Sequence, residues 1–245
     1  MDSAQVIGKD SYRRAAVAAG VLFIVATAAS LLGTAIEQGV LAGRDYLSQI
    51  SDNMNRVSAG GLLELVAAAT SVSIAIALFP VLRRWSVGLA LGAVVFRAIE
   101  AAMYAAAAVS MLSLRNVAEQ FTAAAPANRA WFLAIGDSML GMRQEATLVG
   151  VFAFVLGALM YYYVFYRAQI VPRWLSGWGI LGALLLLAAC LSALFNRNPV
   201  TSYTMLILPI AVQEMVFAIW LIARGFRSTA LERPAGKGVR LSTDA

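Results

Sequence analysis

The chain lacks histidine altogether, and Cys190 is the single cysteine among its 245 residues. Haem held by two histidines, His-ligated zinc or copper, and Ser-His catalytic pairs all need an imidazole, so these chemistries are excluded. One cysteine also excludes an intrachain disulfide and a cysteine cluster for zinc or for iron and sulfur. We therefore expect no metal and no cofactor.

Charged residues are scarce as well, and long apolar runs take their place. Only 13% of the residues are charged and 61% are hydrophobic, whereas a soluble domain has about 25% charged residues. A chain of 245 residues accommodates about six membrane spans of roughly 20 residues each. We predict an all-α, six-helix transmembrane bundle formed by one domain over residues 1–227. Residues 228–245 are polar and contain Gly and Pro, which is typical of a disordered tail.

The apolar segments that could form these spans are six in number. They are predicted at residues 15–36, 59–82, 86–112, 144–166, 174–195 and 203–223. Short turns follow the second and fourth spans, which makes the spans on either side of each turn antiparallel neighbours. Although basic residues precede the first span as in a signal peptide, its apolar run exceeds the usual 7 to 15 or so residues, so we expect it to be retained.

Lys and Arg residues are distributed unequally between the two sides of the predicted bundle. Twelve lie on the side of the termini and six on the other, while Arg97 lies within a span. Because positive flanks tend to stay in the cytoplasm, both termini are predicted to be cytoplasmic. The net charge of +6 then fits cytoplasmic loops that face anionic lipid, and no aromatic and basic module suggests nucleic-acid binding.

Short helices are predicted in the two longest external connections. In the first, apolar residues recur at helical spacing, namely Leu47, Ile50, Met54 and Val57. The second is predicted to begin after Pro126, a residue favoured in the first turn of a helix. Its apolar residues could form a lid over the bundle, or the helix could simply lie at the membrane interface.

Ionisable side chains inside the predicted spans are the candidate functional residues, since charge within a membrane is costly. Arg97 and Glu214 both lie roughly 15 Å from the cytoplasmic face at a rise of about 1.5 Å per residue, so they are natural partners. Glu100 shares a helix face with Arg97. These residues predict a polar pocket that opens outward, with an Arg97–Glu214 ion pair as its floor. The candidate cluster comprises Arg97, Glu100, Glu214, Gln213, Glu64, Arg143 and Glu145.

Four hypotheses remain open for this cluster. The buried ion pairs could only fix which helices pack together. At least one carboxylate exceeds the arginines, so the pocket could bind a small polar or lipidic ligand, or the protein could be a proton- or cation-coupled transporter. Catalysis would be limited to general acid-base work, because no nucleophile motif accompanies the carboxylates, and we do not expect an enzyme. Small residues in the spans permit oligomerisation, and lipids are the expected surroundings.

Several segments resemble, in their order along the chain, a bacterial multi-pass membrane family described only as domain of unknown function four-three-eight-six. They include LFPVLRRW, VVFRAIEAAMY, GVFAFVLGALMYYYVFYRAQIVPRWLSGWGILGAL and QEMVFAIWLIARGF, and the similarity covers about residues 10–227. The family is similar in having an Arg-x-x-Glu pair in the third span, here Arg97 and Glu100, and a carboxylate before the last Trp-Leu, here Glu214. The resemblance implies a bacterial inner-membrane location and no particular activity.

Overall fold

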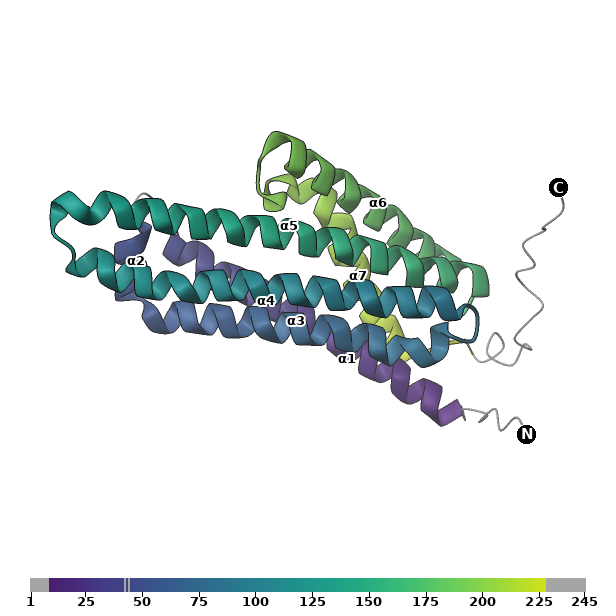
Figure 1. The fold of residues 1–245 in the computed structure, drawn as a ribbon. Coiled ribbons are helices and arrows are strands. Elements are labelled where there is room, and N and C mark those ends of the chain that lie inside the picture. The colour runs from purple at the N-terminus through teal and green to yellow at the C-terminus, as the bar shows by residue number, and fades with distance from the viewer. Residues whose placement is uncertain (1–8, 42, 44, 228–245) are drawn as a thin grey trace.

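The protein folds as a bundle of long helices (Figure 1). The structure is a computed structural model that describes residues 9–41, 43 and 45–227. Its helices are α1 (Lys9–Leu41), α2 (Tyr46–Asp52), α3 (Met54–Leu82), α4 (Val87–Ala123), η1 (Pro126–Asn128), α5 (Arg129–Ala168), α6 (Arg173–Asn196), η2 (Val200–Tyr203) and α7 (Thr204–Ala223). Six of these segments are long and apolar enough to cross a membrane. The predicted six-helix transmembrane bundle is therefore confirmed, and the chain is a multi-pass membrane protein.

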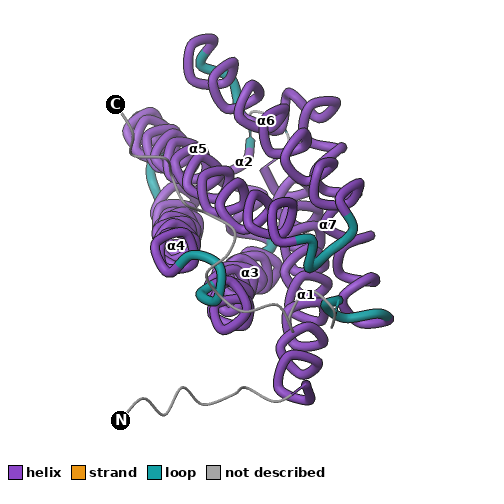
Figure 2. Tube along the Cα trace, turned by 90° about the vertical axis from the view of Figure 1, so that its right-hand side faces the viewer, coloured by secondary structure: helices purple, strands orange, loops and turns teal. Residues whose placement is uncertain are grey.

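The helices are arranged so that chain neighbours pack side by side. α3 contacts α1 and α4, α4 contacts α5, and α7 contacts both α6 and α1. Figure 2 shows α6 beside α5 and α7, away from α3. The start of α1 and the end of α7 lie at one end of the bundle, which we call the terminal end (Figure 1). The opposite end is called the distal end.

Short turns at the terminal end join antiparallel helices, as predicted. The turn between α3 and α4 ends at Ser86, whose side chain accepts a hydrogen bond from the Leu89 amide at 3.2 Å and so caps α4. The turn between α5 and α6 contains Gln169 with a φ of 56° and ends at Pro172, the residue before α6. The left-handed backbone at Gln169 stops α5, and the proline favours the start of the next helix.

Helices α4 and α5 extend well beyond the spans predicted for them. α4 has 37 residues and α5 has 40, which at about 1.5 Å per residue exceeds the roughly 30 Å of membrane hydrocarbon. The second predicted external helix does begin after Pro126, but it runs without a break into the fourth span. The prediction that it is a separate short helix is therefore wrong. No proline lies within α5, so nothing in this stretch forces the helix to stop.

A second apolar core fills the distal extension of the bundle. The short helix predicted in the first connection is present as α2, and its Leu47 and Ile50 are fully buried against Leu114 and neighbouring residues of α4. Tyr46 donates a hydrogen bond to Asp137 Oδ1 of α5 at 2.8 Å. The start of α5 therefore packs beside α2 and α4, instead of covering the bundle as a lid. The predicted tail, residues 228–245, lies outside the described residues.

Candidate functional site

A cluster of three charged side chains lies between α3, α4 and α7, and we call it the central cluster: Arg97, Glu100 and Glu214. Arg97 is only 3% exposed. Its Nη1 donates to Glu100 Oε2 at 2.8 Å and to Oε1 at 3.1 Å, and its Nη2 lies 3.9 Å from Glu214 Oε1. Nη1 also donates to Ser71 Oγ of α3 at 3.2 Å. The closest ion pair of Arg97 is thus with Glu100 on its own helix, and the predicted partner Glu214 is more distant.

Aromatic rings surround the guanidinium of Arg97. Its Cζ lies 4.6 Å from the centre of the Phe154 ring and 5.9 Å from that of Tyr161. These distances are within the range of cation–π attraction, which is strengthened where water is excluded. The hydroxyl of Tyr161 also donates to Glu214 Oε1, at 3.4 Å. α5 therefore stabilises both the positive and the negative members of the central cluster.

Gln213 belongs to a separate polar network, although it neighbours Glu214 in the sequence. It is fully buried, accepts a hydrogen bond from Tyr162 Oη at 2.6 Å, and donates from Nε2 to the Leu175 carbonyl of α6 at 3.1 Å. Successive residues of a helix are turned by about 100°, so Gln213 faces α6 while Glu214 faces Arg97. Gln213 therefore joins α5, α6 and α7 and is not part of the central cluster.

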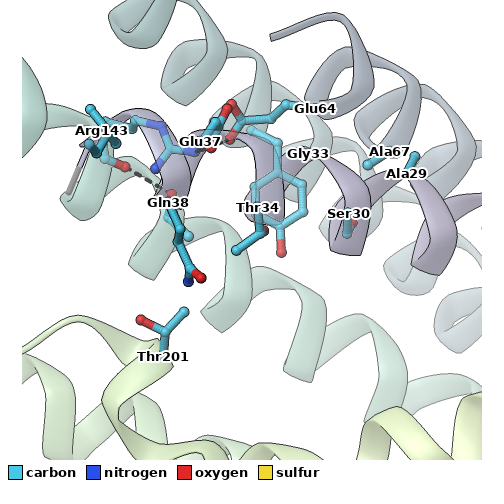
Figure 3. A pocket seen from close by; sticks show the side chains of 13 residues that line it. Ala29, Ser30, Gly33, Thr34, Glu37, Gln38, Glu64, Ala67, Arg143 and Thr201 are labelled. Carbon is cyan, nitrogen blue, oxygen red and sulfur yellow. Dashed lines mark hydrogen bonds and ion pairs between the residues drawn. The ribbon is translucent and has the colours of Figure 1, made fainter. Parts of the chain in front are cut away.

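A second group of charged side chains lies nearer the distal end, and we call it the distal cluster: Glu37, Glu64 and Arg143 (Figure 3). Nη2 of Arg143 on α5 contacts Glu37 Oε2 of α1 and, at 3.4 Å, Glu64 Oε1 of α3. Glu37 is 4% exposed. It was missed in the sequence because the first span was predicted to end one residue earlier. α1 in fact continues to Leu41, and its additional turn carries this carboxylate into the site.

Glu145 does not join either cluster. It is exposed, and with Gln144 and Arg197 it lines a small separate pocket. Two residues along a helix correspond to a rotation of about 200°, so Glu145 lies on nearly the opposite side of α5 from Arg143. The structure therefore places Glu145 outside the candidate cluster predicted from the sequence.

The two clusters open into two adjoining cavities. The distal cavity measures about 320 Å³ and is lined by Glu37, Glu64 and Arg143, and the central cavity measures about 330 Å³ and is lined by all three members of the central cluster. The cavities share five lining residues, Ser30, Ala67, Tyr104, Thr147 and Thr201. Because they have a common wall of this extent, we treat them as one joined pocket with a charged cluster at each end.

A stripe of small polar residues on α1 faces the joined pocket. Thr27, Ser30, Thr34 and Gln38 recur every three or four residues and all line the cavities. This is the spacing of one helix face, so the stripe was visible in the sequence as a polar seam within the first span. None of these residues was among the predicted site residues, because none of them is ionisable. Figure 3 shows Gln38 across from Thr201, which belongs to η2.

α1 and α7 close the pocket at the terminal end. The rings of Phe23 and Phe217 are 5.5 Å apart, and a Cβ atom at Gly20 would lie only 2.8 Å from the Ala218 carbonyl oxygen. Arg13 extends this seam by donating to the Ile222 carbonyl at 2.6 Å. Farther along, residues of both helices line the central cavity instead of packing against each other.

Carboxylates outnumber arginines in the joined pocket. Glu37, Glu64, Glu100 and Glu214 line it, and among the described residues only Arg97 and Arg143 balance them. Within the described part of the chain, Oε1 of Glu37 and Oε2 of Glu64 are buried without a hydrogen-bond partner. Uncompensated buried charge is costly, so this arrangement favours the uptake of positive charge. Residues 9–41, 43 and 45–227 contain no group of three His, Cys, Asp or Glu side chains placed to hold a metal ion.

Comparison with known proteins identifies the family of the chain. The family model described as Domain of unknown function (DUF4386) matches residues 18–225. Since this match covers most of the chain, the protein belongs to this family, and the resemblance seen in the sequence is confirmed. No curated protein and no solved structure matches the chain.

Proposed function

We propose that this member of the DUF4386 family is a bacterial inner-membrane protein that binds a small polar or lipidic ligand in the joined pocket. One observation carries the proposal: two cavities of about 320 and 330 Å³ adjoin each other, and each contains buried charged side chains. Ligand sites are typically concave, mostly apolar, and equipped with a few polar groups that orient the ligand. The joined pocket has this character.

The distribution of basic residues supports an orientation with the terminal end in the cytoplasm. Described arginines at the terminal end include Arg13, Arg83, Arg84, Arg167 and Arg224, next to the ends of five spans. Positive flanks favour the cytoplasmic side. In this orientation the distal cluster lies toward the external face, so a ligand would reach the pocket from outside the cell or from the outer part of the bilayer.

A purely structural role for the charges is the second candidate, and one observation favours it at the distal cluster. Arg143 bridges α1, α3 and α5 through Glu37 and Glu64, so it fixes three helices relative to one another. The central cluster supports this role less, because the closest ion pair there joins two residues of α4. A purely structural role also does not account for the cavities beside the charges.

The proposal is tested by filling the pocket without disturbing the core. Ser30 is exposed and lines both cavities, so Ser30→Phe places a ring in the pocket, and Ala28→Phe adds the same ring two residues away at an exposed position outside the lining. We expect native mass spectrometry of the full chain in mild detergent to detect a small-molecule adduct on the wild type. It should persist in Ala28→Phe and disappear in Ser30→Phe. An adduct retained by both variants, or absent from the wild type, would contradict ligand binding in this pocket.

A further inference from the structure

Within the described part of the chain, each cluster at the ends of the joined pocket contains one more carboxylate than arginine. Glu100 and Glu214 face Arg97 in the central cluster, and Glu37 and Glu64 face Arg143 in the distal cluster. With all groups ionised, each cluster therefore carries a formal charge of −1. A buried carboxylate without a counter-charge is strongly disfavoured, so each end of the pocket can accept one positive charge.

The spacing of the two clusters follows from α3, which touches both. Ser71 accepts a hydrogen bond from Arg97, and Glu64 contacts Arg143. These two α3 residues are seven positions apart, which corresponds to about 10 Å along the helix axis. The two sites for positive charge are therefore separated by roughly the length of a short extended hydrocarbon chain.

The wall between the clusters carries no third charge. The five residues common to both cavities carry no formal charge: Ala67 is apolar, and Ser30, Tyr104, Thr147 and Thr201 each carry a neutral hydroxyl. Methylene groups can pack against Ala67 and the carbon atoms of the other four side chains, whose hydroxyls need no counter-charge from a ligand.

We infer that the joined pocket selects a linear organic dication whose two ammonium groups are about 10 Å apart, one for each cluster, as in an extended α,ω-diamine. This inference rests on the proposed function, since it specifies the ligand class of the same pocket. Two independent features of the pocket support it: the excess carboxylate in each cluster and the uncharged cavity wall that connects them. Glu37, more than nine-tenths buried with an unpartnered Oε1 among the described residues, marks the distal end.

The test compares three amines by isothermal titration calorimetry with the full chain in a neutral maltoside detergent. Octamethylenediamine can reach both clusters, octylamine carries the same chain with one ammonium group, and ethylenediamine has two charges too close together to span the pocket. We expect octamethylenediamine to bind at least tenfold more tightly than either of the others. Equal affinity for octamethylenediamine and octylamine would overturn the two-point recognition.

Charge-neutral variants identify which carboxylates contribute. Glu64→Gln removes the excess charge of the distal cluster, and Glu214→Gln removes that of the central cluster. Each should lower the preference for octamethylenediamine over octylamine to near unity. Glu145→Gln is the matched control, because Glu145 is an exposed carboxylate on the same helix as Arg143 but outside the joined pocket. A preference that survives both cluster variants, or that is lost equally in Glu145→Gln, would overturn the inference.

The two proposals fail in different ways. If no amine binds while the native adduct is present and is removed by Ser30→Phe, the dication inference is overturned and ligand binding in the pocket stands. If octamethylenediamine binds as expected and Ser30→Phe abolishes its binding while Ala28→Phe does not, both proposals are supported. If octamethylenediamine binds equally to the wild type and to Ser30→Phe, its site lies elsewhere and the inference is overturned.

Discussion

Replacing Arg97 with methionine should strongly destabilise the protein, because the arginine is the only cation of the central cluster among the described residues. Its side chain is 3% exposed and contacts both oxygens of Glu100, with Glu214 close by. Removing one partner of a buried ion pair typically costs about 3–5 kcal/mol, mostly because the remaining charge is left without compensation. We expect Arg97→Met to lower the free energy of unfolding by this amount.

A second variant separates the cost of uncompensated charge from the loss of packing. Arg97→Met combined with Glu100→Gln keeps the methionine but neutralises the more buried carboxylate, whose side chain is 4% exposed, compared with 14% for Glu214. The double variant should recover at least about half of the stability lost in the single variant.

The assay is reversible unfolding from maltoside micelles by added SDS, followed by far-ultraviolet circular dichroism. Arg97→Met, the double variant and the wild type are compared at the same protein concentration. A loss below about 1 kcal/mol in Arg97→Met would show that burial of the unpaired carboxylates is not costly here. A double variant no more stable than the single one would assign the loss to packing, including the contact with Phe154.

Two further predictions use the same unfolding assay. Gln213→Leu leaves the hydroxyl of Tyr162 without its acceptor and should cost about 1–3 kcal/mol, whereas Val212→Leu, at an exposed position, should cost little. Tyr46→Phe removes the hydrogen bond to Asp137 and should cost about 1 kcal/mol. Burial raises the pKa of Tyr46, and the hydrogen bond to Asp137 raises it further. The contribution of Tyr46 to the free energy of unfolding should therefore be constant through neutral pH and decline only above the ordinary tyrosine pKa of about 10.

Each of these two predictions has a clear contradictory result. Equal stability of Gln213→Leu and Val212→Leu would show that the buried amide network is energetically neutral. The difference in unfolding free energy between the wild type and Tyr46→Phe should not change between about pH 6 and pH 9. A change in that range would show that another group titrates there, because a tyrosine with a raised pKa does not.

The all-helical fold class and the number of membrane spans were predictable from the sequence, because hydropathy and length determine which segments can cross a membrane. Counting residues along each span also placed Arg97 and Glu214 at the same depth, and the structure brings them within 3.9 Å of each other. Counting residues did not predict that Glu100, and not Glu214, is the closest partner of Arg97. The choice of closest partner depends on how each helix is rotated about its axis, and packing with neighbouring helices determines that rotation.

The division of the charged residues into two clusters was also beyond the sequence. Hydropathy falls near Glu37, so the first span was ended before it, although α1 continues to Leu41. Glu145 has nearly the same depth as Arg143 and was grouped with it, but the helix turns it away from the pocket. The depth of a residue along the membrane normal can be counted within one segment. The direction in which its side chain points depends on how the helices pack in the assembled bundle.

The position of the joined pocket follows from the way the first and last helices meet. At the terminal end Gly20 lacks a side chain, which lets Ile222 and the Ala218 carbonyl approach α1 closely, and the Phe23–Phe217 contact lies next to it. A side chain at Gly20 would separate the helices there, so this glycine keeps the seam closed on that side. The charged groups lie farther along, where α1 and α7 line the central cavity. The proposed ligand should therefore enter away from the terminal end, in the part of the bundle where α1 and α7 line the central cavity instead of packing against each other.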